Sequence, residues 1–500
     1  MKKLDWLLLI LSTILYALPF LWSYQLWWLI FIFPVPLLYI NRTENLSFIH
    51  GYVWGITVFA LHLHAGILIV ANLAGDWWWV GFLMGIVMVL YQALIPAVLF
   101  WGANRLVRFF SVTSPIIRLC IWTSALAIFI FYTDWYCMWV FDMNGYPFMH
   151  PLLPLAQHPS LLQFLPTVGK QLLLMLFLLV PASIVIVIWY KNSVSVLFCI
   201  IALMPWTWWG MHQPKDENHP DWYKKIVSLP CMIRAHTQSG ALRILGHHIK
   251  KLTAVYPEAS IIIMPESALE SIKDEILPIT NIILLHRSKF SPALALNLLK
   301  GFFERSRIPF NRFRASANKR NILNWLQGMC NISHQYCERE RELHLIFGAC
   351  SCENGNYYNS LYWIHNGAVR LRFDKKHVML MTECLADWMN ADWLRKIYFK
   401  NGISITSSCN ERKLLQLTES VAFVPYICSE LFFNEQPDDC YPDTPIVAII
   451  NDTLLSDSYM KELLLLMAKF KTIQWQRNIV YVSYSVSVFI DEGMIKEINS

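Results

Sequence analysis

Apolar and polar positions divide the chain into two unlike parts. Up to Gly210 long apolar runs are separated by short polar stretches, whereas after Asp221 apolar and polar residues alternate at shorter intervals. A bilayer core takes about 20 apolar residues per crossing, and such segments must be helical because lipid offers backbone polar groups no partners. The pattern therefore predicts a transmembrane bundle at residues 1–209 with about seven helices. The candidate runs are residues 5–22, 26–40, 48–73, 77–101, 116–132, 169–189 and 194–209, of which the second and seventh are short.

The basic residues of this first part predict how the bundle is oriented. If all seven runs cross, these residues fall on one side of the membrane, and the long connection at 133–168 on the other side has no Lys or Arg. Basic residues concentrate on the cytoplasmic side, so we expect a cytoplasmic N-terminus and export of the residues after 209. A cleaved signal peptide at 1–22 is the alternative, but no small-residue cleavage site follows it. The basic residues concerned are Lys2, Lys3, Arg42, Arg105, Arg108, Arg118 and Lys191.

Composition supports a membrane protein and narrows its chemistry. Of the 500 residues 56% are hydrophobic and 15% are charged, and the mean hydropathy is +0.39, which is too apolar for a water-soluble protein of this size. The formal net charge of +6 is spread along the chain, so we expect no nucleic-acid partner. The 12 cysteines lack the repeated paired spacing of metal sites, and we expect neither a metal nor a cofactor.

The second part of the chain reads as one α/β domain. A polar, proline-bearing linker is expected at 210–228 and the domain at 229–500. Apolar runs rich in β-formers alternate with helical stretches, which is typical of an α/β fold. The predicted strands are residues 259–264, 342–349, 360–365, 421–427, 446–450 and 479–488, and the predicted helices are 242–255 and 459–474.

Three of these apolar runs end in residues that could perform acyl transfer. Glu266 follows one strand, Lys375 follows a second and Cys428 follows a third. A Cys thiolate can attack a carbonyl, a Glu can remove and return protons, and a Lys can stabilise the oxyanion while favouring the thiolate. Each residue also has an ordinary structural interpretation: a small core residue for the Cys, a solvated face for the Lys and a turn for the Pro-Glu pair.

The short sequence motifs around these residues resemble those of the apolipoprotein N-acyltransferase family. This family is the membrane-attached branch of the nitrilase or carbon-nitrogen hydrolase superfamily. The matching stretches are Met-Pro-Glu-Ser-Ala at 264–268, Phe-Asp-Lys-Lys-His at 373–377 with Glu383, and Cys-Ser-Glu at 428–430. Tyr-Asn-Ser at 358–360 and Asn-Asp at 451–452 are supporting words. The resemblance implies a multi-pass α-helical membrane bundle joined to a nitrilase-like αββα sandwich in the periplasm of a bacterial inner membrane.

The resemblance also implies a reaction and its residues. Cys428 is the expected nucleophile, Glu266 the general base and acid, and Lys375 the oxyanion stabiliser. Glu383 is expected to support Lys375, and Glu430 to orient the loop beside the nucleophile. A membrane phospholipid is the implied acyl donor, and the amine of a lipoprotein's diacylglyceryl-cysteine is the implied acceptor.

Three departures from the family pattern keep other functions open. Ser429 stands where the family usually has a tyrosine after the nucleophile. At 451–456 this chain has Asn-Asp-Thr-Leu-Leu-Ser, whereas the family motif contains Trp-Phe-Gly after Asn-Asp. The chain also ends at Ser500 without the apolar run of the family's eighth helix. One alternative is a conjugal-transfer protein with a nitrilase-like domain, and a second is a catalytically inactive assembly module of this fold.

A basic stretch near 286–320 has no counterpart in this scheme. It carries nine Lys or Arg residues and one acid, interleaved with Leu and Phe. One interpretation is a solvated insertion. The other is an interfacial arm that binds anionic lipid headgroups and gates lipid entry to Cys428.

Overall fold

The computed structural model describes most of the helical part and the two sheets of the second part. The basic stretch near 286–320 lies outside the described residues. The described residues are 3–22, 24–41, 46–73, 78–134, 149–211, 222, 225–229, 233–235, 238–256, 260–266, 269–271, 327, 329–333, 343–353, 356–379, 383–384, 405–408, 412–419, 421–433, 444–453 and 459–498.

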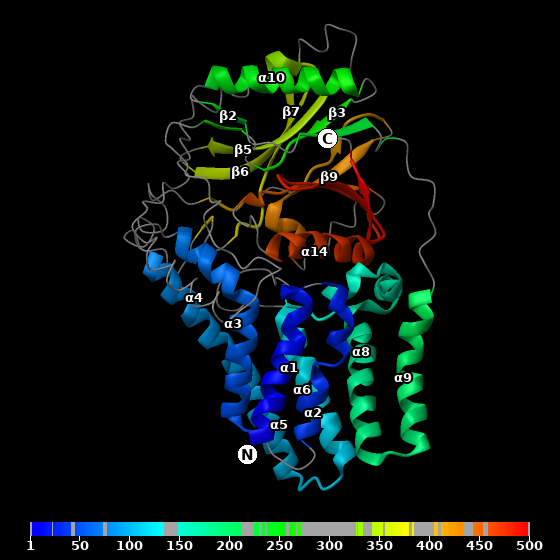
Figure 1. Cartoon of the computed structure of the whole chain (residues 1–500). Helices are drawn as coiled ribbons and strands as arrows, with labels where there is room; N and C mark the ends of the chain where they lie inside the picture. The colour runs from blue at the N-terminus through cyan, green and yellow to red at the C-terminus, as the bar shows by residue number, and fades with distance from the viewer. Residues whose placement is uncertain are drawn as a thin grey trace.

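The first part folds as a bundle of apolar helices (Figure 1). Five segments are long and apolar enough to cross a membrane, which agrees with five of the predicted runs. The fourth predicted run is longer than expected, because α4 and α5 continue one another to Phe109 with a break at Ala93. The elements of these segments are α1 (Lys3–Leu21), α3 (Phe48–Leu73), α4 (Trp78–Gln92), α5 (Leu94–Phe109), α6 (Pro115–Asp134) and α8 (Leu165–Tyr190).

The two short runs form less regular elements. The run at 26–40 becomes a 3-10 helix η1 (Tyr24–Phe31) followed by the helix α2 (Pro34–Ile40). The proline at the start of α2 has no N–H to donate into a preceding helix, so the chain turns there. The last run forms α9 (Ser193–Met211), which lies against α8.

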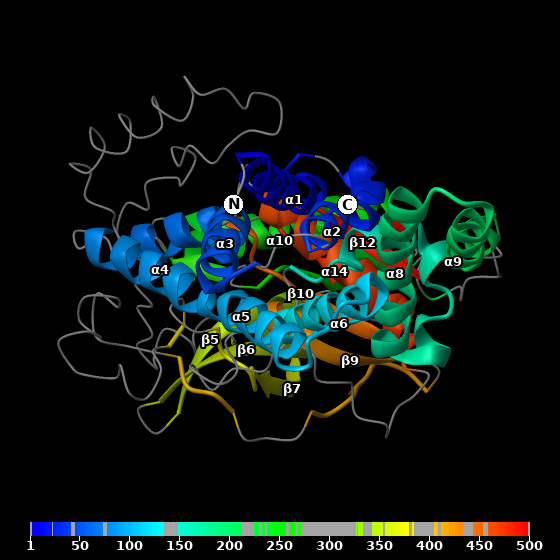
Figure 2. The ribbon, with the colours of Figure 1, turned by 90° about the horizontal axis from the view of Figure 1, so that it is seen from below.

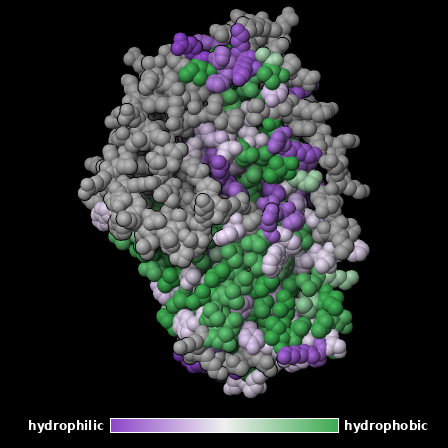
Figure 3. Space-filling view, in the orientation of Figure 1, coloured by the Kyte–Doolittle hydropathy of each residue, from purple (hydrophilic) through white to green (hydrophobic). Residues whose placement is uncertain are grey.

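Figure 1 places the N-terminus at one end of the bundle and the sheets at the other. Seen from below, the bundle helices lie beneath the strands of the second part (Figure 2). The visible side of the bundle is covered by hydrophobic residues, whereas hydrophilic residues gather on the second part (Figure 3). Apolar side chains such as Val87, Met204 and Trp208 are more than half exposed, as expected for a surface that contacts lipid.

Two glycines bring α3 and α5 into close contact. A Cβ added at Gly51 would lie 2.5 Å from the Pro96 carbonyl oxygen and 2.8 Å from the Ala97 Cα. One at Gly55 would lie 2.6 Å from the Pro96 ring. Small residues spaced four apart allow helix backbones to approach in this way.

We expect Gly51→Ala to lower the thermal midpoint of the detergent-purified protein. The added methyl group must push two helix backbones apart, and such overpacking costs about 1–3 kcal/mol. Gly66→Ala, on the same helix, is the matched control because its Cβ would meet nothing within 4 Å. The control should be neutral or slightly stabilising, since alanine favours helix over glycine. Equal midpoints for the two variants would show that the contact at Gly51 is unimportant.

The second part contains two sheets packed face to face. The first has the order β1-β3-β5-β6-β7 and the second the order β13-β12-β11-β10-β9-β8. In the first sheet the strands are β1 (Ile226–Ser228), β3 (Ile261–Ile263), β5 (His344–Glu353), β6 (Asn356–His365) and β7 (Ala368–Asp374). In the second they are β8 (Leu415–Gln416), β9 (Ala422–Ile427), β10 (Ile446–Ile449), β11 (Ile479–Val482), β12 (Ser487–Asp491) and β13 (Met494–Glu497). A separate pair joins β2 (Ile233–Ala235) and β4 (Leu269–Ser271).

Two predicted boundaries are wrong. The strand β1 begins at Ile226, so the last three residues of the stretch predicted as a linker belong to the first sheet. The run at 479–488, predicted as one strand, is two antiparallel strands, because the chain turns between β11 and β12. Hydrophobic periodicity is the same on both sides of such a turn, which explains the error.

Two helices cover the outer faces of the sheets and complete four αββα layers. Leu245 and Ile249 of α10 (Gln238–Val255) pack on the first sheet. The helix α14 (Tyr459–Trp475) packs on the second sheet. Between the sheets lies a third apolar cluster that includes Ile263, Phe423 and Val480. The αββα arrangement implied by the resemblance is thus present in the described residues.

The helix α14 also joins the second part to the bundle. Its apolar residues share one buried cluster with those of α1, α3 and α8. The Tyr459 hydroxyl donates to the His62 carbonyl oxygen, and Lys469 Nζ donates to Gln157 Oε1 at 3.2 Å. Gln157 ends the 3-10 helix η3 (Leu153–Gln157) at this end of the bundle. The second sheet therefore stands on the bundle through a single buried helix layer.

Candidate active site

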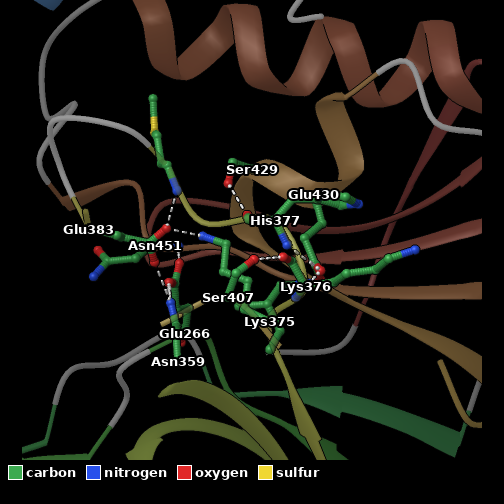
Figure 4. A network of polar contacts seen from close by, with 12 residues as sticks. Glu266, Asn359, Lys375, Lys376, His377, Glu383, Ser407, Ser429, Glu430 and Asn451 are labelled. Carbon is green, nitrogen blue, oxygen red and sulfur yellow. Dashed lines mark hydrogen bonds and ion pairs between the residues drawn. The ribbon is translucent and has the colours of Figure 1, made fainter. Parts of the chain in front are cut away.

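The three residues predicted at strand ends come together where the two sheets meet. Glu266 lies just beyond β3, Lys375 directly follows β7 and Cys428 directly follows β9. Glu266 and Lys375 are buried, at 5% and 1% exposure, and Cys428 is half-buried. Figure 4 shows Glu266, Lys375 and Glu383 directed toward one another from separate segments.

An ion pair and an amide bridge connect the two carboxylates of the site. Lys375 Nζ lies 2.7 Å from Glu383 Oε2. The Asn359 amide donates to Glu266 Oε1 and, at 2.8 Å, to Glu383 Oε1. Asn359 also fixes the lysine backbone, since the Lys375 N–H donates to the Asn359 carbonyl oxygen at 2.7 Å. One asparagine thus sets the spacing of both carboxylates and of Lys375.

The Glu266 side chain accepts hydrogen bonds from three directions. Besides Asn359, the Asn451 N–H donates to Oε2 at 3.0 Å, and the Cys428 thiol donates to the same carboxylate. Burial raises the pKa of Glu266, and the Glu383 charge adds to this, while Lys375 and the hydrogen bonds act in the opposite direction. A base with a raised pKa next to a thiol is suited to accept the thiol proton.

The charges around Lys375 keep it protonated. Burial alone would lower the pKa of its ammonium group, but the charges of the neighbouring carboxylates, Glu383 first and then Glu266, outweigh burial and raise it. The ammonium group is therefore a permanent positive charge beside the sulfur. Such a fixed charge can stabilise an oxyanion that develops during acyl transfer.

Cys428 occupies a strained backbone position between β9 and the 3-10 helix η8 (Cys428–Phe432). Its φ of +48° lies in the left-handed region, which non-glycine residues seldom adopt. Strained backbone conformations of this kind cluster at functional sites. The sharp turn lets the strand end while the sulfur stays beside Glu266.

The surroundings of Cys428 keep its thiol protonated at rest. Burial raises the pKa of the thiol well above its usual value, and the charges of Glu266 and Glu383 raise it further. Lys375 lowers the thiol pKa, which is the direction expected of a nearby cation, but it does not outweigh burial and the two carboxylates. Cys428 rests as a thiol and must lose its proton during the reaction.

Glu430, two residues after Cys428, is the centre of a second set of contacts. Its carboxylate accepts the N–H groups of Lys376 at 2.8 Å and Ile427 at 2.9 Å. The Arg412 guanidinium lies 3.5 Å from Glu430 Oε1 and 3.7 Å from the centre of the Tyr426 ring. Glu430 thereby joins the segment after Lys375 to the strand before Cys428.

Sequence reasoning missed part of this site. Asn359 and Asn451 were noted only as parts of short motifs shared with the resembling family. Arg412 and Tyr484 were not predicted as site residues. The Tyr484 hydroxyl donates to the Glu266 carbonyl oxygen at 2.8 Å. The only local signal was a polar side chain at the end of an apolar strand, which Asn451 shares with Glu266. Within the described residues, no group of three or more His, Cys, Asp or Glu side chains could hold a metal ion.

No family model and no curated protein matches the sequence. Among solved structures, the chain is similar to Nit3 from Saccharomyces cerevisiae, a member of branch 10 of the nitrilase superfamily, at 11% identity and a TM-score of 0.33. That match covers 55% of this chain and 86% of Nit3. It is also similar to a carbon-nitrogen hydrolase from Helicobacter pylori, at 8% identity and a TM-score of 0.34, covering 54% and 82%. A third is a CN-hydrolase superfamily protein from Xanthomonas campestris with an arsenic adduct in its active site, at 12% identity and a TM-score of 0.31, covering 54% and 84%.

Proposed function

We propose that this chain is a membrane-bound N-acyltransferase. In this proposal a phospholipid gives an acyl chain to Cys428, and the N-terminal amine of a lipoprotein's diacylglyceryl-cysteine then accepts it. The observation that carries the proposal is the Cys428 thiol hydrogen-bonded to Glu266, with the Lys375 ammonium group held beside both by Glu383. The choice of substrates follows from the resemblance of the sequence to the apolipoprotein N-acyltransferases.

In the first half-reaction Glu266 takes the thiol proton as the sulfur attacks the ester carbonyl carbon. The C–S bond forms, and negative charge develops on the carbonyl oxygen beside Lys375. When the tetrahedral intermediate collapses, the C–O bond to glycerol breaks, and Glu266 returns its proton to the departing oxygen. A lysophospholipid leaves and the acyl chain remains on Cys428 as a thioester.

In the second half-reaction a neutral amine attacks the thioester carbonyl carbon. Glu266 takes a proton from the amine as the C–N bond forms, and the C–S bond then breaks. Glu266 returns the proton to the sulfur, which restores the thiol. An amide and the free enzyme are the products.

The position of the site supports lipid substrates. The nucleophile's helix η8 contacts α14, and α14 in turn lies on the end of an apolar bundle. In the proposed arrangement the N-terminus is cytoplasmic in a bacterial inner membrane, and the two sheets lie in the periplasm. Substrates anchored in the outer leaflet would then reach Cys428 without leaving the bilayer, which keeps their effective concentration high.

We expect a thioester adduct on Cys428 when the detergent-purified protein is incubated with phosphatidylethanolamine. Intact-protein mass spectrometry should find one added acyl chain that hydroxylamine removes. Cys330→Ser is the matched control, because Cys330 is another half-buried free cysteine that packs among apolar residues outside the site. This control should form the adduct, and Cys428→Ser should not.

The acceptor is tested in the same preparation. Addition of a diacylated lipopeptide with a free α-amine should discharge the adduct and produce a triacylated peptide, while the N-acetylated peptide should not react. If water alone removed the acyl chain from Cys428, the protein would be a hydrolase and not a transferase. Absence of any adduct on the wild type, alongside an acyltransferase that forms one, would contradict the proposal.

A further inference from the structure

The end of the bundle farthest from the sheets combines exposed aromatic rings with arginines. The helix α5 ends at Phe109 and is followed by Phe110. These two residues are 81% and 65% exposed, and their rings meet edge to face with centres 5.0 Å apart. Arg105 and Arg108 lie in the last turns of α5, and Arg118 lies in the first turn of α6. Figure 1 shows this turn at the N-terminal end of the bundle.

An open recess of about 560 Å³ lies along the last turns of α5. Its walls are Gly102, Arg105, Leu106, Arg108 and Phe109. Gly102 leaves space there, since a Cβ at this position would meet nothing within 4 Å. The recess is thus lined by apolar residues together with the side chains of Arg105 and Arg108.

The turn that carries the recess is held in place by several contacts. Ser111 adopts a left-handed φ of +46°, and the Val112 N–H donates to the Val107 carbonyl oxygen at 2.9 Å. Arg118 Nε donates to the Val112 carbonyl oxygen at 2.9 Å. The Arg105 guanidinium lies 5.6 Å from the centre of the Trp101 ring. The arginines are thus attached to an ordered turn.

The charge of this surface favours one class of ligand. No Asp or Glu occurs between residues 77 and 133, so no carboxylate in this stretch of the chain can neutralise the three arginines. Guanidinium groups bind phosphate oxygens, and exposed Phe rings next to basic residues insert at the boundary between lipid headgroups and acyl chains. We propose that this recess binds the headgroup of an anionic phospholipid in the leaflet opposite the sheets, with Phe109 and Phe110 inserted among the acyl chains. The proposal rests on the membrane location proposed above and is independent of the acyl-transfer chemistry.

Native mass spectrometry of lipid retention tests this site. Cys428→Ser protein, in which acyl transfer cannot consume lipid, is exchanged into bicelles with equal amounts of phosphatidylglycerol and phosphatidylcholine. Each arginine near an anionic headgroup favours binding by roughly fivefold, so we expect a preference for phosphatidylglycerol of about tenfold or more. Replacing Arg105, Arg108 and Arg118 by Gln should reduce this preference to about twofold or less.

The matched control removes three charges from the opposite pole of the molecule. Arg243, Lys250 and Lys251 are exposed residues of α10, and replacing them by Gln should leave the preference unchanged. Raising the salt concentration should weaken the preference in the unmutated recess, which tests the site without any change to the bundle. Equal retention of the two lipids before mutation, or an equal loss in the α10 control, would overturn the proposal.

Discussion

Glu266→Gln should slow thioester formation on Cys428 by roughly a thousandfold. The thiol rests protonated, because burial and two carboxylates raise its pKa. Attack therefore needs a base in contact with the sulfur, and general-base catalysis contributes about 10²–10⁴ in rate. Glutamine keeps the shape of the side chain and can still accept the Asn451 N–H. The ion pair of Lys375 with Glu383 stays intact, so the thermal midpoint should change little.

The pH dependence separates this role from a structural one. Glu266 accepts a proton only when it is ionised, so wild-type acylation should fall as the pH drops through its pKa. Since burial raises that pKa, the fall should occur at a higher pH than for an ordinary carboxylate. The glutamine variant should lack this limb, and its residual rate should rise as hydroxide removes the thiol proton.

Glu353→Gln is the matched control for this experiment. Glu353 is an exposed carboxylate at the end of β5 that pairs with Arg372 at 3.0 Å, away from Cys428. It should acylate at the wild-type rate with the wild-type pH profile. A Glu266→Gln variant that retains the acidic limb would show that another group is the base.

The apolar pattern predicted much of the fold. Runs longer than 18 residues can only be buried in lipid or in a large core, so their positions were read correctly for five helices. Strands β3, β9 and β10 also lie where they were predicted, because each is a buried parallel strand with a continuous apolar run. The turn between β11 and β12 was missed because no glycine or proline marks it.

The site was predicted less completely than the fold. Polar residues at strand ends stand out after apolar runs, and those of this site also match short motifs of a known family. This is why Glu266, Lys375 and Cys428 were predicted. Asn359 lies within β6, where nothing local separates it from an ordinary strand amide. Asn359 bridges the carboxylates of Glu266 and Glu383, which lie close together only in the folded chain because they are 117 residues apart in the sequence. Such non-local contacts also decide the charge balance around Cys428, which a single sequence does not show.

Lys375→Met should slow acyl transfer strongly and also destabilise the protein. The ammonium group is fully buried between Glu383 and Glu266, and its loss leaves two carboxylates bridged by one asparagine. Removing one member of a buried ion pair costs about 3–5 kcal/mol, because the remaining charge has no partner. The loss of oxyanion stabilisation costs a further factor of roughly 10²–10³ in rate. Lys413→Met, at an exposed position, should change neither property.

The double variant Lys375→Met with Glu383→Gln separates the two effects. Neutralising Glu383 removes the unpaired buried charge, so most of the lost thermal stability should return. Asn359 can still donate to the side-chain oxygen of the introduced glutamine, which preserves the bridge to Glu266. Thioester formation should stay as slow as in Lys375→Met, because no cation faces the developing oxyanion. Recovery of acylation together with stability would mean that Lys375 serves only to balance Glu383, and the mechanism proposed for this site would then lack its electrostatic step.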